Sequence, residues 1–258
     1  MLTTLALSLA FLPLVPAPQQ PASGSIGIDP RPVDGPRLDV LHFDNLPAGR
    51  VPSELFGRFG AGPVLVQGTN PDFGGANAAL VFDSANPTGG DPDLGSPNMD
   101  FGGPGVGAGG EAASPFANTA SLRKVLVVAD DLTDANNDGL VDDPGDSAEQ
   151  GTSLVFDFSP VGGARLDALT VIDAESINGP ATVELFDGAA QSLGLFEIPT
   201  VGDNGVARVP LGKTPNVMMM EVVLNGSAAI DNIIFLPFTG ATLRGRIWDD
   251  LDGDGLQD

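Results

Sequence analysis

Short apolar runs separated by Gly, Pro, Asn and Asp recur along most of the chain and set its expected architecture. Several runs alternate apolar and polar side chains with a period of two, as where Thr182 and Glu184 fall on one face of 182–186. No segment sustains the helical period of about 3.6 residues over about ten positions. Strands are predicted at 39–43, 64–67, 79–82, 124–128, 153–158, 168–172, 182–186, 193–198, 206–210, 217–224 and 229–235.

Many short strands at regular spacing predict an all-β fold, an antiparallel jelly-roll-like β-sandwich. Residues 38–238 are expected to form this domain, which is long enough to bury roughly 70% of its unfolded surface without disulfides. Within it, 88–118 consists mostly of Gly, Pro, Asp, Ala and Asn. A loop of this length is expected to be functional or mobile.

The two ends of the chain differ in composition from this domain. Residues 1–22 begin with the apolar run MLTTLALSLAFLPLVPA and continue with small residues, which predicts a secretory signal peptide and an extracellular or cell-surface protein. The run is short and broken by Pro, so no transmembrane segment is expected in the mature chain. A Pro-, Gly- and Ser-rich linker is predicted at 23–37, and 239–258 reads as the truncated start of a second, incomplete β module.

Charge and residue usage exclude several classes of function. The chain has 34 Asp and Glu against 11 Lys and Arg, a net charge of -23, which disfavours nucleic acid and anionic membranes as partners and favours cations. Cysteine and tyrosine are absent and there is one His, so thiolate metal sites and most acid–base sets are excluded. We therefore do not expect an enzyme.

Two aspartate-rich loops carry the main functional signal. Each places oxygen side chains at loop positions 1, 3, 5 and 9 with Gly at position 6, the spacing that wraps hard oxygen ligands round Ca²⁺. The bidentate Glu of an EF-hand is missing, since Gly145 stands at position 12 of the first loop. The predicted ligands are Asp134, Asn136, Asp138, Leu140 (through its backbone carbonyl) and Asp142 in the first loop, and Asp250, Asp252, Asp254, Leu256 (likewise) and Asp258 in the second.

A further calcium site is a candidate at Asp83, Asp91 and Asp93, which flank the Gly89-Gly90 corner. Ordinary turn chemistry, which favours Asp, Gly and Pro without any ion, is the alternative explanation.

Catalysis has one weak candidate, the pair Asp173 and Glu175, which lie on one face if the strand continues past 172. Two such acids would suit a glycoside hydrolase, but a solvated strand edge explains them equally well. His42 lies in an apolar strand and is expected to be a hydrogen-bonded strand residue without a functional role.

The segment 245–258, GRIWDDLDGDGLQD, resembles the opening of the B-type module of serine-aspartate repeat (SdrD) adhesins. Ile247 and Asp252 replace Val and Asn of the G-x-V-W-x-D-x-N-x-D-G pattern. The resemblance implies an immunoglobulin-like, calcium-binding β-sandwich of which only the start is present.

Segments 43–47 (FDNLP), 82–95 and 229–233 (AIDNI) resemble those of bacterial exported jelly-roll surface domains. In similar carbohydrate-binding jelly rolls a structural Ca²⁺ joins the first and last strands, which implies Asp44 and Asp231 as further ligands. The expected function is a calcium-binding, non-enzymatic surface or adhesin-type structural or binding protein, with an extracellular glycan or surface protein as partner. A carbohydrate-binding module is the alternative, disfavoured by one Trp and no Tyr, and a glycoside hydrolase ranks below it.

Overall fold

The computed structural model describes residues 37–175 and 179–238. The predicted signal peptide (1–22), nearly all of the linker (23–37), and the C-terminal module (239–258) with its calcium loop lie outside the described residues. The strands are β1 (Asp39–Leu41), β2 (Glu54–Leu55), β3 (Val64–Thr69), β4 (Ala79–Asp83), β5 (Lys124–Val128), β6 (Ser153–Asp157), β7 (Ala164–Ile172), β8 (Thr182–Phe186), β9 (Ser192–Glu197), β10 (Val206–Val217), β11 (Met219–Val223) and β12 (Ala229–Pro237). Short 3₁₀ helices are η1 (Pro71–Phe73), η2 (Pro92–Leu94), η3 (Met99–Phe101), η4 (Ala108–Gly110) and η5 (Ser159–Val161).

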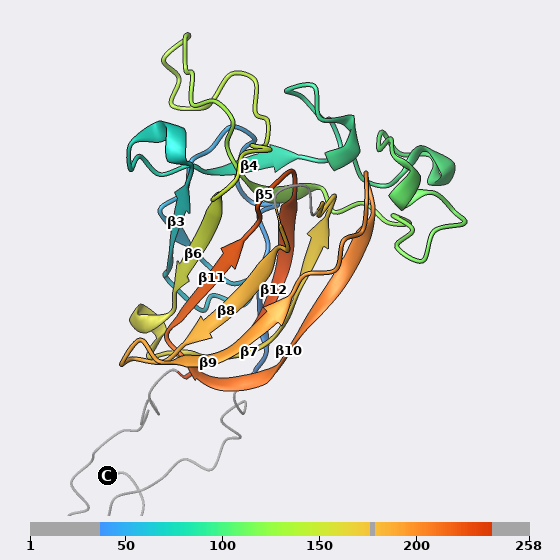
Figure 1. Ribbon diagram of the computed structural model, residues 1–258. Helices are drawn as coiled ribbons and strands as arrows, with labels where there is room; N and C mark the ends of the chain where they lie inside the picture. The colour runs from blue at the N-terminus through green and yellow to red at the C-terminus, as the bar shows by residue number, and fades with distance from the viewer. Residues whose placement is uncertain (1–36, 176–178, 239–258) are drawn as a thin grey trace, which may run out of the picture. The chain divides into compact units, whose positions relative to one another are not determined.

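These strands form two antiparallel sheets that pack as a sandwich (Figure 1). One sheet runs β10-β7-β12-β5-β4, with β1 also paired to β12, and the other runs β2-β3-β6-β11-β8-β9. The consecutive strands β5 to β12 occur in the orders β5-β12-β7-β10 and β6-β11-β8-β9, which is the arrangement of an eight-stranded jelly roll. The predicted fold class is therefore confirmed, with β2, β3 and β4 added at the edges and β1 paired to β12.

The main core lies between the sheets and follows from the period-two pattern. In β8 the side chains of Val183 and Leu185 are buried while their neighbours are partly exposed. Phenylalanines supply much of the volume, and the rings of Phe158 and Phe235 are 5.6 Å apart. Burying each such ring contributes roughly 2–3 kcal/mol, so the domain is stabilised without disulfides.

A second core lies on the opposite side of β5. Leu126 and Val128 belong to the main core, whereas Val125 and Val127 face the other way and are also fully buried. The second core includes Val141 from the β5–β6 loop, together with Leu80, Phe82, Leu94, Ala129, Ile172 and Ala229. Long loops therefore cover part of the outer face of this sheet, which explains why β5 is apolar on both faces.

Buried asparagines fix the long β4–β5 loop over the sheet. Asn204, which follows β9, accepts hydrogen bonds at Oδ1 from Asn98 Nδ2 (2.8 Å) and Asn118 Nδ2 (3.2 Å). Its own Nδ2 donates to the carbonyls of Asp93 and Gly95, each at 2.6 Å. All three asparagines are at most 1% exposed, so the loop is held by a polar network sealed from water.

The strand boundaries differ from prediction at several points. Strand β10 continues to Val217, well beyond the predicted 206–210, with register shifts at Pro210/Thr214 and Thr214/Val217. As an edge strand it tolerates prolines that would break a central one, which is why sequence reasoning ended it early. The short strand β2 was not predicted, and β1 ends at Leu41.

Candidate functional site

The first aspartate-rich loop is anchored at its end by an apolar residue. Val141 is buried in the second core, and its backbone N–H donates to the Gly49 carbonyl at 2.8 Å. Asp142 N–H donates to the Thr133 carbonyl at 3.0 Å and so closes the loop. The position of the predicted ligands is therefore coupled to the packing of the outer core.

The side chains of this loop fold inward onto its own backbone. Asp134 accepts hydrogen bonds from the N–H groups of Asp138 (Oδ1, 3.1 Å) and Gly139 (Oδ2, 2.9 Å). Asn136 Oδ1 accepts from Asp138 N–H at 2.8 Å, and Asp142 accepts from Asn136 Nδ2 at 2.8 Å. Gly139 has φ of +85°, the left-handed turn predicted for position 6. These oxygens retain free lone pairs for a cation.

A cleft of about 380 Å³ joins this loop to the end of β4. Asn136, Asp138 and Asp142 line one part of it, and Asp83, Asn86 and Thr88 line another. The structure thus brings Asp83, predicted for a separate site, to the predicted ligands of the first loop. Nowhere in 37–175 or 179–238 are three or more His, Asp or Glu side chains already arranged to hold a metal ion.

Asp83 already has a cationic partner in Lys124. Lys124 Nζ lies 2.5 Å from Asp83 Oδ2, and both side chains are about one-fifth exposed (20% and 18%). Burial alone would raise the pKa of Asp83, but hydrogen bonds from Lys124 and Asn86 outweigh it and lower that pKa. A cation entering the cleft would therefore meet a carboxylate that is ionised but shared with Lys124.

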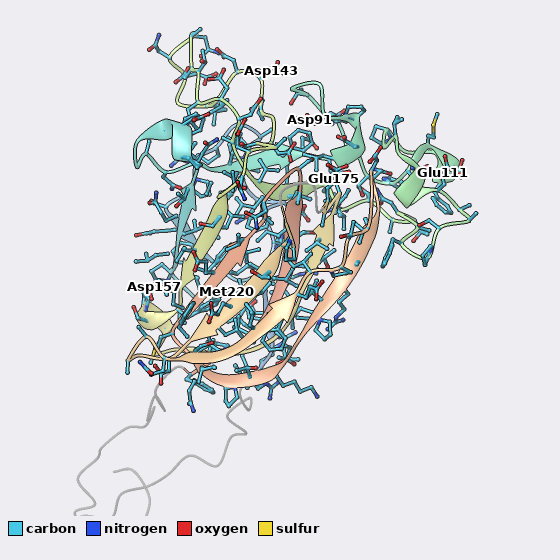
Figure 2. All side chains as sticks on the ribbon, in the orientation of Figure 1. Asp91, Glu111, Asp143, Asp157, Glu175 and Met220 are labelled. Carbon is cyan, nitrogen blue, oxygen red and sulfur yellow. The ribbon has the colours of Figure 1, made fainter. Side chains whose placement is uncertain are left out.

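Asp91 belongs to a different acidic group, which includes Asp93 and Asp143, and it lies at the same end of the sandwich as Asp143 and Glu175 (Figure 2). Burial and the charges of Asp93, Asp130 and Asp143 raise the pKa of Asp91 to about 6. Burial and the charge of Asp203 raise the pKa of Asp93. The three predicted residues Asp83, Asp91 and Asp93 thus face two different surroundings.

One carboxyl of this acidic end, that of Asp146, was not expected from the sequence. Burial, followed by the charge of Asp91, raises the pKa of Asp146 well above its ordinary value. Asp146 N–H donates to Asp91 Oδ2 at 3.2 Å, and its carboxylate accepts from Ala228 N–H at 2.8 Å. The only sequence signal for Asp146 is its place one residue after the missing position-12 ligand.

The weak catalytic candidates, Asp173 and Glu175, follow the end of β7. Asp173 is buried, with φ of +62°, and accepts from Ser227 Oγ (2.5 Å) and Asn204 N–H (2.7 Å). Burial raises the pKa of Asp173 to about 7 despite these bonds. Burial and Asp203 raise the pKa of Glu175. The hydrogen bonds of Asp173 fix the β7–β8, β9–β10 and β11–β12 connections to one another.

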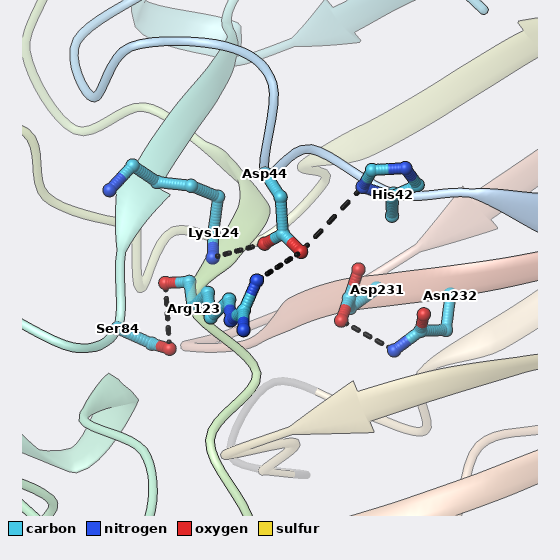
Figure 3. Close-up of polar contacts among 7 residues, drawn as sticks. All are labelled: His42, Asp44, Ser84, Arg123, Lys124, Asp231 and Asn232. Atoms are coloured by element: carbon cyan, nitrogen blue, oxygen red, sulfur yellow. Dashed lines mark hydrogen bonds and ion pairs between the residues drawn. The ribbon is translucent and has the colours of Figure 1, made fainter. Parts of the chain in front are cut away.

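Asp44 and Asp231, implied by resemblance, do lie near each other (Figure 3). Burial and the charge of Asp44 raise the pKa of Asp231 to about 8. Asp44 follows β1 and Asp231 lies in β12, so this pair lies next to the end of the β1–β12 pairing at Leu41 and Ile233.

Comparisons with protein-family models and with curated protein sequences gave no match to this chain. None of the described residues form a helix long and apolar enough to cross a membrane.

Proposed function

We propose that this chain is an exported, non-enzymatic surface protein of the adhesin type, whose β-sandwich is stabilised by Ca²⁺ and serves as a scaffold or binding domain. The observation that carries the proposal is the cleft in which Asn136, Asp138 and Asp142 meet Asp83. The apolar N-terminal run and the adhesin-like pattern of 245–258 support the location.

The proposed mechanism is electrostatic. Clustered carboxylates repel one another until a divalent cation neutralises them, so the free energy of binding becomes free energy of folding. Val141, next to the ligand Asp142, is buried in the second core. Calcium bound in the loop would therefore also hold the loops that cover the outer face of the sheet.

The test is a thermal melt of the mature chain, residues 23–258, in EDTA and in increasing Ca²⁺. With calcium at about 100 times its Kd, binding adds about 2.7 kcal/mol, or a Tm rise of about 5–10 °C. The double variant Asp134→Asn/Asp138→Asn should lose that rise. The matched control Asp157→Asn/Asp187→Asn changes two carboxylates that bond only to nearby backbone N–H groups, and it should keep the rise.

Identical melts of the wild type in EDTA and calcium would reject the proposal. A rise that survives in the Asp134/Asp138 variant would move the ion away from this loop, to the group around Asp91 or to Asp44 and Asp231.

A second candidate, carbohydrate binding, is favoured by one feature. A shallow cleft of about 260 Å³ crosses β1, β12, β7 and β10, with aliphatic residues beside the polar side chains of Thr170, Arg208 and Asn232. Such a mixture suits a sugar ring, although the cleft has no aromatic platform. Retention on insoluble polysaccharides that is lost in Arg208→Ala would support this function, and no retention by the wild type would remove it.

A further inference from the structure

The corner where the chain leaves β1 and passes β12 contains unsatisfied polar atoms. Across residues 37–175 and 179–238, His42 Nδ1 and Asp231 Oδ1 are the buried side-chain nitrogen and oxygen atoms without a hydrogen-bond partner. Asp231 is 3% exposed, and its other oxygen accepts from Asn232 Nδ2 at 2.6 Å. Buried polar groups are nearly always paired, so two such atoms at one corner are available to bind a ligand.

Backbone irregularity places Asp231 in this corner. Strand β1 pairs with β12 through Leu41 and Ile233, so the residues after Leu41 run past Asn232 and Asp231. The register of β12 against β7 shifts between Asp231 and Ile234, and Asn232 has φ of +50°. Such a bulge redirects side chains, a common feature next to functional sites.

Asp44 adds a second carboxylate to the corner. Its Oδ2 lies 3.7 Å from His42 Nδ1 and 3.8 Å from Arg123 Nη1, and Arg123 is largely exposed. Asp44 Oδ1 accepts from Lys124 N–H at 3.2 Å. Figure 3 shows Asp231 directed toward the side where His42 and Asp44 lie, with Arg123 beside Asp44. Two carboxylates and one imidazole therefore share a corner with one weakly held cation.

We propose that His42, Asp44 and Asp231 bind one divalent transition-metal ion of the Zn²⁺ type, at a site separate from the calcium loop. Imidazole nitrogen suits Zn²⁺, Ni²⁺ and Cu²⁺, whereas Ca²⁺ takes oxygen ligands, so the presence of His42 selects the metal class. The ion pairs with both orphan atoms and replaces Arg123 as the partner of Asp44. The inference does not depend on calcium binding at 134–142.

Metal binding requires a small rearrangement. The three side chains are not closed round one point in this structure. Asp44 can move, because its side chain is 32% exposed and its contacts with His42 and Arg123 are long. The bound ion then cross-links the chain just after β1 to β12.

The experiment uses the untagged mature chain after EDTA treatment and dialysis. The chain contains one His, so its imidazole ¹⁵N resonances report His42 alone. Zn²⁺ is added while these resonances are followed, and affinity is measured by calorimetry. We expect one Zn²⁺ per chain, a shift of the Nδ1 resonance, and a loss of affinity of at least tenfold in both His42→Gln and Asp231→Asn.

The controls separate this site from the calcium loop. Asp134→Asn/Asp138→Asn should leave Zn²⁺ affinity unchanged. His42 is partly exposed, so His42→Gln tests the site even where Asp231→Asn fails to fold. Unshifted imidazole resonances, or Zn²⁺ affinity equal in wild type and His42→Gln, would overturn the proposal. In the Asp134→Asn/Asp138→Asn background, Ca²⁺ binding that is lost in Asp231→Asn but persists in His42→Gln would also overturn it, because the site would then use oxygen ligands only.

Discussion

Replacing Asn204 by Gly should detach the long β4–β5 loop from the sandwich. Asn204 forms four side-chain hydrogen bonds, with Asn98, Asn118 and the carbonyls of Asp93 and Gly95. Each is worth about 1 kcal/mol net, which gives a loss of about 4 kcal/mol. Asn204 has φ of +66°, which Gly adopts freely, so backbone strain adds nothing to the change.

For about 200 ordered residues this loss corresponds to a Tm lower by about 8–16 °C. Thermal melts give the total effect, and hydrogen exchange across 84–123 locates it. Asn137→Gly is the matched control, because Asn137 also has positive φ (59°) but is exposed and donates only one bond, to the Ala135 carbonyl. A Tm within about 3 °C of the wild type, with unchanged exchange in the loop, would refute the argument that the buried asparagines hold it.

Three further changes test other parts of the structure. Gly49→Ala should lower the free energy of unfolding by about 2 kcal/mol and weaken the calcium response, because its φ is +79° and the new Cβ would overlap the Val141 carbonyl. The control Gly74→Ala, where φ is +60° and no atom is near the new Cβ, should lower the free energy of unfolding by less in the same melts. Asp173 keeps its proton in the folded state up to a pKa of about 7, whereas the unfolded chain loses it near pH 4, so stability should fall as pH rises between these values. Asp173→Asn can still accept the hydrogen bond from Asn204 N–H, and it should reduce the loss of stability between urea melts at pH 5 and pH 8. An unchanged loss of stability would show that it does not come from Asp173. Lys124→Met should cost about 1 kcal/mol by leaving Asp83 without its ion pair, and equal urea midpoints would show that the pair contributes nothing.

Local pattern was sufficient to predict the fold class but not the second core. The alternation in 182–186 and similar runs reflects one face turned to the main core, a property that each strand carries in its own sequence. By contrast, Val125 and Val127 are buried by Leu94 and Val141, which come from two different loops. Nothing local in the strand shows which loops will cover it.

The candidate sites also combine features that depend on local sequence with features that depend on packing between distant segments. The spacing of the predicted ligands in 134–142 is a local pattern, and so is the Gly139 turn, which the structure confirms. The meeting of that loop with Asp83 depends on the packing of β4 beside β5, and the burial of Asp231 depends on an irregularity in β12. His42 was expected to be a hydrogen-bonded strand residue; it lies just after β1, and its Nδ1 has no hydrogen-bond partner among the described residues.

The pairing of β1 with β12 determines how the domain would respond to tension. Asp39 lies opposite Phe235, so the chain enters and leaves the sandwich side by side (Figure 1). A pull applied between the two ends would open this ladder like a zipper, loading its three residue pairs one after another and not together. Strand β1 would peel away at low force, while the jelly roll from β5 to β12 has its own strand ladders. A cross-link just beyond β1, at Asp44 and Asp231, would stop the peeling there and raise the force that the domain withstands.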